Sequence, residues 1–179
     1  IYLDYTVFED YDAITRSMRI VNEGEKFRLT NALSTTVDFV SATDMDVIHL
    51  DGAWARERFI TRNRIVKGNQ NVESFCGASS AYHNPFVAIC EKDATEQSGN
   101  VYGLSLVYSG NFTAGAQMNP YDSVRAYIGI NPFEFEFILE NGDTLVLSKH
   151  KIRMGYKVEA GNAYIDGHDI SGLAQSVIN

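Results

Sequence analysis

One segment of the chain combines residue types that bind sugars with types that move protons. It runs His49-Leu50-Asp51-Gly52-Ala53-Trp54-Ala55-Arg56-Glu57-Arg58 and contains the only tryptophan. A tryptophan raised on a Gly-Ala turn offers a flat apolar face that can stack on the C–H face of a sugar ring. The alternative is that Trp54 fills a core, which is the commoner place for this residue. The charged run Arg56, Glu57 and Arg58 is then either part of a pocket or a solvated ion-pair cluster.

A second polar segment stands directly before an apolar run. It reads Ser79-Ser80-Ala81-Tyr82-His83-Asn84-Pro85, and the proline pushes Asn84 toward an extended conformation. His83 is a candidate general base, because imidazole titrates near neutral pH. The alternative, which base rates favour, is a hydrogen-bonded structural histidine in a loop.

Other chemistries receive little support from residue spacing. Glycoside hydrolysis requires two opposed carboxylates, and nothing singles out a pair among the candidates Asp44, Asp46, Asp51 and Glu57. The histidines at 49, 83, 150 and 168 lack the spacing of a zinc motif. We therefore expect no catalytic residue, no metal and no cofactor in this chain. His49 or His83 paired with Glu57 as acid and base would be the alternative, a mutarotase-like sugar epimerase.

Composition limits the classes of partner. The net charge of −8 and the pI near 4.9 disfavour nucleic acid and anionic membranes, since both carry negative charge. No signal peptide and no apolar run of ~20 residues is visible, so we expect a cytoplasmic location and no membrane contact. Cys76 and Cys90 are expected as buried free thiols, with a disulfide across a hairpin as the alternative.

The elements that must position these residues are strands. Period-two alternation or short apolar runs, separated by turn residues, predict strands at 14–21, 27–39, 86–90, 101–108, 124–130, 133–139 and 144–147. Residues 1–7 alternate as though already inside a strand, which suggests a piece of a longer protein. Short strands without intervening helices predict an all-β antiparallel sandwich.

Several motifs, in collinear order, resemble the N-terminal region of family 36 α-galactosidases. They include Gly52-Ala53-Trp54 with Arg56-Glu57-Arg58, Gly77-Ala78-Ser79-Ser80, Asn84-Pro85-Phe86, Val107-Tyr108-Ser109-Gly110-Asn111-Phe112 and Ile128-Gly129-Ile130-Asn131-Pro132-Phe133. The resemblance covers residues 1–145, and residues 146–179 form an unassigned tail that could complete the sandwich.

The resemblance implies a β-supersandwich, similar to galactose mutarotase, that precedes a catalytic (β/α)₈ barrel. The catalytic carboxylates of the family lie on that barrel. Trp54 is then a substrate contact for α-galactoside sugars, and Asp51, Arg56, Glu57, His83 and Asn84 belong to a pocket or barrel-contact loop. The implied partners are the barrel and further copies in a homo-oligomer.

Three functions follow from these observations. The first is an accessory sandwich of an α-galactosidase that has no hydrolytic activity alone. The second is a free-standing carbohydrate-binding module built around Trp54. The third is the sugar epimerase, which ranks last because similarity of fold does not transfer chemistry.

Overall fold

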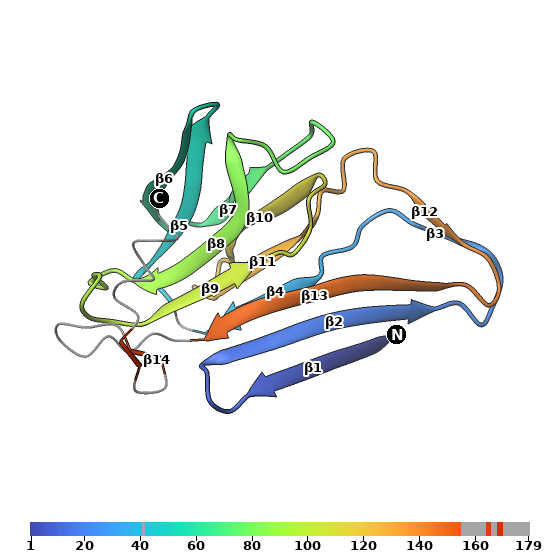
Figure 1. Ribbon diagram of the computed structural model, residues 1–179, viewed down its shortest axis with the longest axis horizontal. Coiled ribbons are helices and arrows are strands. Elements are labelled where there is room, and N and C mark those ends of the chain that lie inside the picture. Colours follow the sequence, from blue (N-terminus) through green and yellow to red (C-terminus); the bar gives the residue numbers. More distant parts are fainter. Residues whose placement is uncertain (41, 155–163, 166–167, 170–179) are drawn as a thin grey trace.

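The protein is built from strands only, in the part of the chain that the structure describes. The computed structural model describes residues 1–40, 42–154, 164–165 and 168–169 (Figure 1). All secondary-structure elements in these ranges are strands. The described residues contain no helix that is long and apolar enough to cross a membrane. The prediction of an all-β fold is confirmed.

The larger sheet has seven strands, all in antiparallel pairs. Its order is β1-β2-β13-β9-β8-β5-β6, so that β1 and β6 form its two edges. The central strands β8 and β5 carry the segments that sequence analysis singled out. The bounds are β1 Tyr2–Phe8, β2 Ala13–Val21, β5 Met45–Ala53, β6 Arg56–Arg64, β8 His83–Glu91, β9 Val101–Ser105 and β13 Thr144–Met154.

A smaller sheet packs against the larger one. It has the order β10-β11-β4, and β7 lies along β10 through the Ser74 N to Phe112 O hydrogen bond of 2.9 Å. Strands β3 and β12 form a separate ribbon beside the long ends of β2 and β13 (Figure 1). The bounds are β3 Phe27–Leu29, β4 Thr35–Phe39, β7 Gly68–Glu73, β10 Phe112–Met118, β11 Val124–Ile130 and β12 Phe137–Leu139, with a further short pair of β14 Tyr164–Ile165 and β15 His168–Asp169.

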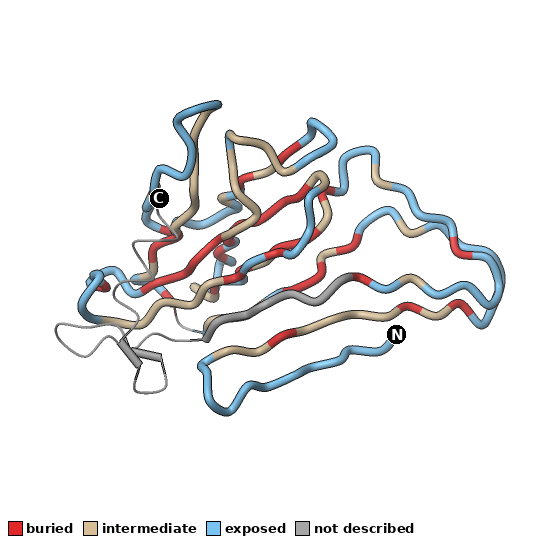
Figure 2. The backbone as a smooth tube through the Cα atoms, in the orientation of Figure 1, coloured by how far each residue is buried: buried red, intermediate tan, exposed pale blue. Residues whose placement is uncertain are grey.

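The core lies between the inner faces of these two sheets. Val87 and Ile89 of the larger sheet face Phe112, Ala114 and other fully buried residues of the smaller one. Alternation along β11 sends every second side chain inward, which is the period-two rule of a half-buried strand. Figure 2 shows the buried residues concentrated on β8, β10 and β11, whereas β1 is exposed along its whole length. The molecule is therefore a sandwich, as predicted.

Some predicted strands differ from the observed ones. The run 27–39 is two strands, β3 and β4, because residues 30–34 leave the extended pairing. The run 133–139 is a strand only over Phe137–Leu139, and the run 101–108 ends at Ser105. Strands β5, β6, β7 and β10 were not predicted, since their polar and small residues mask the alternation. The expected strands at 14–21, 86–90 and 124–130 are confirmed.

Strand β13 extends past the expected domain boundary between residues 145 and 146. It pairs with β2 from Thr144 to Arg153 and with β9 from Lys151 to Met154. The first part of the predicted tail therefore joins the larger sheet. Residues 155–163, 166–167 and 170–179 lie outside the described part of the chain, and the proposed division at 145 remains a prediction.

Arg62 of β6 binds both Asp46 of β5 and the loop that connects β8 to β9. Arg62 Nε donates to Asp46 Oδ2 at 2.7 Å, and its terminal nitrogens donate to the carbonyl oxygens of Glu91, Lys92 and Ala94. Hydrogen bonding to Asp46 raises the pKa of Arg62. This arrangement ties the β8–β9 connection to β6.

We expect Arg62→Met to destabilise the fold. The change leaves the buried Asp46 carboxylate without its shortest partner and frees three loop carbonyl groups, so we expect a loss of about 2 kcal/mol. Chemical denaturation measures the free energy of unfolding. Arg125→Met is the control, because the Arg125–Asp38 pair is bidentate but solvent-exposed. Equal losses in the two variants would contradict the role given to Arg62.

Candidate functional site: a tryptophan hairpin above a histidine–aspartate cluster

The hairpin of β5 and β6 presents Trp54 at its tip. The strands pair from Asp46↔Arg64 to Ala53↔Arg56, which leaves Trp54 and Ala55 as the turn. Ala55, the second residue of the turn, has a φ of 62°, in the left-handed region that non-glycine residues rarely adopt. The register shifts between Asp51 and Ala53, and this irregularity falls at Gly52.

Gly52 allows the two strands to approach each other beside the turn. A Cβ atom at this position would lie 2.5 Å from the Arg56 carbonyl oxygen and 2.6 Å from Glu57 Cα. The Gly52 amide also donates to the Tyr82 carbonyl oxygen at 2.9 Å, which ties the hairpin to the segment before β8. Only glycine fits this position without displacing β6.

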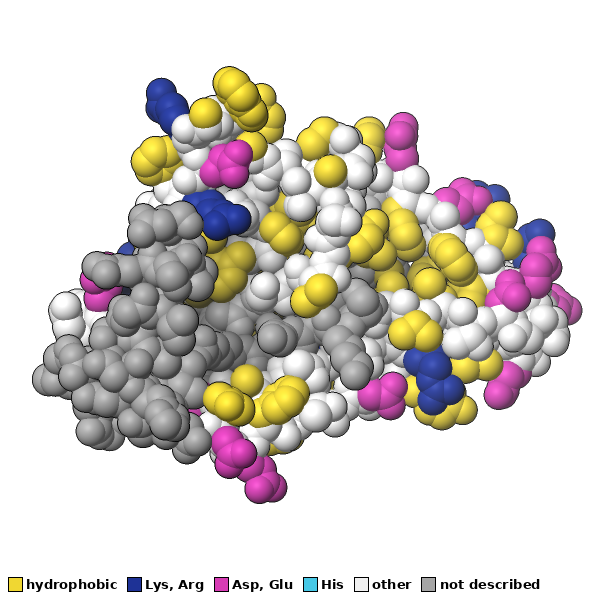
Figure 3. All heavy atoms as spheres, viewed as in Figure 1, with side chains coloured by type: hydrophobic (Ala, Val, Ile, Leu, Met, Phe, Trp, Pro, Cys, Tyr) yellow, Lys and Arg dark blue, Asp and Glu magenta, His cyan; other side chains and the backbone are white. Residues whose placement is uncertain are grey.

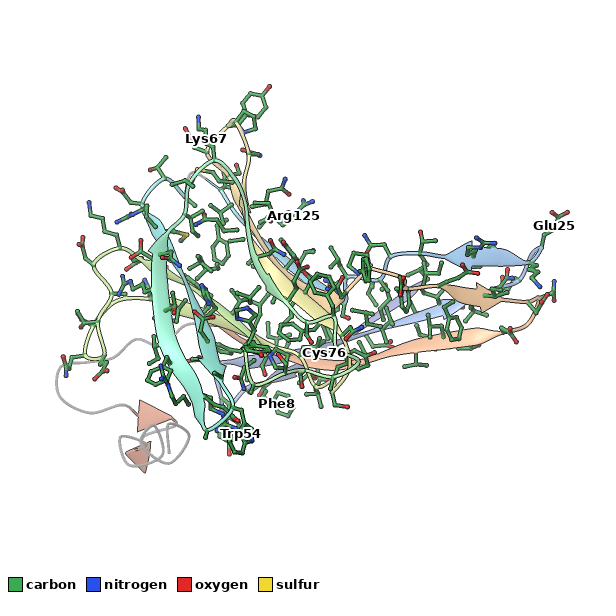
Figure 4. All side chains as sticks on the ribbon, turned by 90° about the horizontal axis from the view of Figure 1, so that it is seen from above. Phe8, Glu25, Trp54, Lys67, Cys76 and Arg125 are labelled. Carbon is green, nitrogen blue, oxygen red and sulfur yellow. The ribbon has the colours of Figure 1, made fainter. Side chains whose placement is uncertain are left out.

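Trp54 is 87% exposed, so the alternative that it fills a core is wrong. Phe59 and Ile60 on β6 are also more than half exposed, as is Tyr82 beside the hairpin. Figure 3 shows hydrophobic side chains gathered at the top of the view, over this hairpin, and Figure 4 shows Trp54 at its tip. We call the exposed residues Trp54, Phe59, Ile60 and Tyr82 the hairpin patch. Phe59 and Ile60 are consecutive on β6, so they lie on the two opposite faces of the hairpin.

A polar cluster lies at the root of the hairpin. His49 and Asp51 project from the same face of β5, and the register places His83 of β8 directly opposite Asp51. His49 Nδ1 and His83 Nδ1 each lie 2.8 Å from Asp51 Oδ1. Thr61, opposite His49 on β6, donates to Asp51 Oδ2 at 2.5 Å. We call His49, Asp51 and His83 the His–Asp–His cluster.

The cluster favours an ionised Asp51. Burial raises the pKa of the Asp51 carboxyl, but the hydrogen bonds from Thr61, His49 and His83 outweigh burial and hold the pKa below its usual value. His49 Nε2 lies 3.4 Å from Asn63 Nδ2, an arrangement in which the ring carries its proton on Nδ1 and accepts at Nε2. The carboxylate therefore orients both imidazole rings.

Two cavities border the cluster. His49 lines a cavity of about 200 Å³ with Asn63, Gln70 and Asn71, and the core residues Val47 and Val87 form its floor. His83 lines a wider cavity of about 550 Å³ with Tyr82, Cys76 and Glu73. Asn71 and Val72 belong to both, so the two cavities adjoin along β7. Both cavities therefore lie beside residues of the His–Asp–His cluster, one next to His49 and the other next to His83.

The structure brings together some predicted site residues and separates others. Asp51 and His83 meet in the cluster, whereas Arg56 and Glu57 are exposed on the hairpin. Asn84 follows His83 in β8 and is half-buried. Thr61 and Asn63 were missed, although both lie at alternate positions after the turn on the side of His49. The carboxylate that contacts both histidines is Asp51, not the Glu57 that the epimerase hypothesis requires.

The acidic residues of this region do not form an opposed pair. Asp46 and Asp51 lie on opposite faces of β5, since they are an odd number of residues apart. Asp46 binds Arg62 and lies 3.1 Å from Arg64 Nε, and Asp44 is exposed. Two carboxylates on opposite faces of one strand cannot flank the same glycosidic bond.

The two cysteines lie in different environments. Cys90 is fully buried in β8, as expected, but Cys76 is exposed, so the expectation that both are buried is wrong. Both thiols are free. The Ser74 hydroxyl, 3.2 Å from Cys76 Sγ, lowers the pKa of the Cys76 thiol, whereas burial raises the pKa of the Cys90 thiol.

Comparison with known proteins gives a consistent family. The family model "Glycosyl hydrolase family 36 N-terminal domain" matches residues 1–140. Alpha-galactosidase AgaA of Geobacillus stearothermophilus is 49% identical over 143 residues, which are 79% of this chain and 20% of that protein. Probable alpha-galactosidase C of Aspergillus terreus is 38% identical over 145 residues, or 80% of this chain and 19% of that protein. The chain thus spans about a fifth of the length of these relatives.

Solved structures agree with the sequence relatives. The crystal structure of AgaA superimposes with a TM-score of 0.84 at 43% identity and covers 88% of this chain and 22% of that one. The alpha-galactosidase of Lactobacillus brevis gives a TM-score of 0.84 at 34% identity, over 88% of this chain and 21% of that one. Variants of AgaA have been solved in complex with raffinose and with stachyose.

We expect Gly52→Ala to destabilise the chain by about 1–3 kcal/mol, because the new methyl group overlaps the backbone of β6. Chemical denaturation measures this loss, and the emission spectrum of Trp54 reports the altered hairpin. Gly24→Ala is the control, since the nearest atom to a Cβ there is Asn22 Oδ1 at 3.8 Å. A Gly52→Ala variant as stable as Gly24→Ala would show that the hairpin tolerates the extra atom.

The cysteines predict selective alkylation. In the native protein, iodoacetamide should modify Cys76 and leave Cys90 intact until the chain is unfolded. Because the Cys76 pKa is lowered, its rate should reach half of its maximum at a lower pH than that of the unfolded chain, and Ser74→Ala should shift this midpoint upward. Mass spectrometry of alkylated peptides gives both rates. Equal labelling of the two residues in the native state would refute the assignment.

Proposed function

The chain belongs to the glycosyl hydrolase family 36 N-terminal domain family, and from this membership we propose that it is the accessory sandwich of an α-galactosidase. The observation that carries the proposal is the match of residues 1–140 to this domain, in relatives that are named α-galactosidases and are about five times longer. Hydrolysis of terminal α-galactosyl residues is assigned to a separate catalytic barrel. The opposite orientation of Asp46 and Asp51 supports this assignment.

Trp54 is the proposed sugar contact of the domain. Its ring is almost fully exposed at the end of a hairpin in which the strands approach closely at Gly52 and Ala55 of the turn has a left-handed backbone. A rigid aromatic face binds the C–H face of a pyranose with little loss of side-chain entropy. The proposed substrates are α-galactosides such as raffinose and stachyose, the sugars bound to AgaA variants.

The hairpin patch is the proposed contact with the barrel. Phe59 and Ile60 lie on opposite faces of β6, so a second domain that encloses the hairpin would cover both of them together with Trp54 and Tyr82. Each large apolar side chain that is removed from water contributes about 1.5–3 kcal/mol, which is sufficient to hold two tethered domains together. Arg56 and Glu57 are placed to provide polar contacts around this apolar centre.

The opposite edge of the larger sheet is the proposed oligomer contact. Strand β1 exposes Tyr2, Leu3, Tyr5 and Val7, and an exposed edge strand with apolar side chains favours pairing with another chain. This surface is distant in the sheet from β6, so barrel docking and assembly need not compete.

A carbohydrate-binding module remains the second candidate, because an exposed tryptophan also suits a free-standing stacking platform. The two functions differ in the affinity of the isolated chain. A half-pocket that needs the barrel gives no change in Trp54 fluorescence at millimolar galactose, whereas a binding module gives a saturable change. We expect the flat titration.

A chimera tests the accessory role. Residues 1–140 replace the matching N-terminal segment of AgaA, and the activity on raffinose is measured with and without Trp54→Ala. We expect the chimera to be active and Trp54→Ala to lower kcat/KM by about tenfold, the equivalent of ~1.4 kcal/mol of lost stacking.

Tyr121→Ala is the matched control. Tyr121 is also 87% exposed, but its turn is held by the Lys67–Asp122 pair, and Figure 4 shows Lys67 at the end of the sandwich away from Trp54. We expect its kcat/KM to stay within about twofold of the parent chimera. An inactive chimera that is folded, or equal effects of the two substitutions, would contradict the proposed role.

A further inference from the structure

The His–Asp–His cluster has no part in the proposed sugar contact, yet its three side chains converge on one point. We propose that His49, Asp51 and His83 form a binding site for one divalent metal ion of the zinc class. His49 and Asp51 come from β5, and His83 comes from the neighbouring β8. The site is independent of the accessory role, since it uses no residue outside this chain.

The geometry is close to that of a metal site. One ligand atom from each residue can be chosen so that all three lie within 4.8 Å of one another. Around Zn²⁺, with bonds of about 2.0–2.2 Å to nitrogen and oxygen, tetrahedral ligands are roughly 3.3 Å apart. The two Nδ1 atoms now lie 2.8 Å from Asp51 Oδ1, so each must move outward by about half an ångström. Side-chain rotation supplies such a movement without a change in β5 or β8.

The donor set selects the ion. Two imidazole rings and one carboxylate suit Zn²⁺, Co²⁺, Ni²⁺ or Cu²⁺, whereas Mg²⁺ and Ca²⁺ prefer oxygen ligands throughout. Three protein ligands leave a fourth position for water. The cavities that His49 and His83 line provide the space for that water on the side facing β7.

The neighbours of the ligands are placed to support the ion. Thr61 Oγ1 holds the second oxygen of Asp51 and so fixes the plane of the carboxylate. The Asn63 amide lies next to His49 Nε2, and with its oxygen turned toward the ring it accepts the Nε2 proton when Nδ1 binds metal. Partners of this kind set the orientation and the tautomer of metal-bound histidines.

Partial burial adds to the case. The side chains of His49, Asp51 and His83 are 15%, 30% and 33% exposed, which is enough for an ion to enter and little enough to strengthen its electrostatic attraction. The Asp51 carboxyl group lies between the two imidazole rings, with each Nδ1 atom 2.8 Å from Oδ1, so its oxygen and both nitrogens face the position that an ion would take.

The first experiment titrates the 179-residue chain, without an affinity tag, with Zn²⁺ against a chromophoric chelator. We expect one ion per chain with a dissociation constant in the micromolar range or below. Co²⁺ should give the visible absorption of a four-coordinate nitrogen–oxygen site. Mg²⁺ and Ca²⁺ at millimolar concentration should not displace either ion. Absence of stoichiometric Zn²⁺ binding would overturn the proposal.

Four variants locate the ion. Asp51→Asn and His83→Gln each remove one ligand and should weaken Zn²⁺ binding by about tenfold or more. Glu57→Gln and Cys76→Ser are the controls, because they remove an exposed carboxylate of the same hairpin and the exposed thiol near His83. Unchanged affinity in Asp51→Asn, or loss of affinity in Cys76→Ser, would place the ion elsewhere and overturn the assignment.

A measurement on the unmutated chain covers the case in which a ligand variant does not fold. In an NMR spectrum of the Co²⁺-loaded chain, the ring protons of His49 and His83 should show paramagnetic shifts that the metal-free chain lacks. Shifts confined to other residues would contradict the site. A negative result here leaves the chimera experiment with AgaA unaffected, so failure of the metal site and failure of the accessory role are distinguishable.

Discussion

The structure depends on β5, a strand that is hydrogen-bonded on both sides, to β6 and to β8. The backbone of such a strand forms hydrogen bonds with two neighbouring strands, and its side chains alternate between the two faces of the sheet. The register of β5 therefore decides which side chains lie on the inner face and which on the outer face. The odd-numbered residues of β5 lie on the inner face, where Val47 belongs to the core and His49 and Asp51 belong to the cluster. Even-numbered residues send Asp46 to the outer face, where Arg62 binds it together with the carbonyl groups of the β8–β9 connection. A slip of one residue would place Asp46 in the core, so the register is strongly specified.

The same strand explains why the base of the hairpin is paired on both sides while its tip is exposed. Beyond Asp51, β5 leaves β8 and pairs with β6 alone, and Gly52 permits the close approach that the turn requires. Nothing in the described part of the chain covers Trp54, Phe59 and Ile60. A monomer gains no stability from exposed apolar side chains of this size, whereas a domain that packs against a neighbour does. The arrangement is consistent with a family in which this domain makes up about a fifth of the protein.

The polar cluster shows how a charged group is accommodated at the end of an apolar core. Asp51 follows Val47 and His49 along the inner face, and a partly buried carboxylate there would be costly without partners. It has three, from β5, β6 and β8, and their combined hydrogen bonds outweigh burial in setting its pKa. The strands on either side of β5 thus contribute to its electrostatics as well as to its backbone hydrogen bonds. The ordering of both imidazole rings follows from the same three contacts.

The sequence alone determined the fold class, because period-two alternation is local and survives in strands such as β2 and β11. It also identified the segments around Trp54 and His83, since their residue types are unusual wherever they fold. It did not determine the exposure of Trp54, which depends on which strands cover the hairpin and not on the residues beside it. Nor did it bring His83 to Asp51, because that contact joins residues that are 32 apart in the chain and exists only through the pairing of β5 with β8. The order of residues therefore determines which side chains are neighbours along the chain. Contacts between distant side chains depend on the strand register, which is fixed only when the sheets pack.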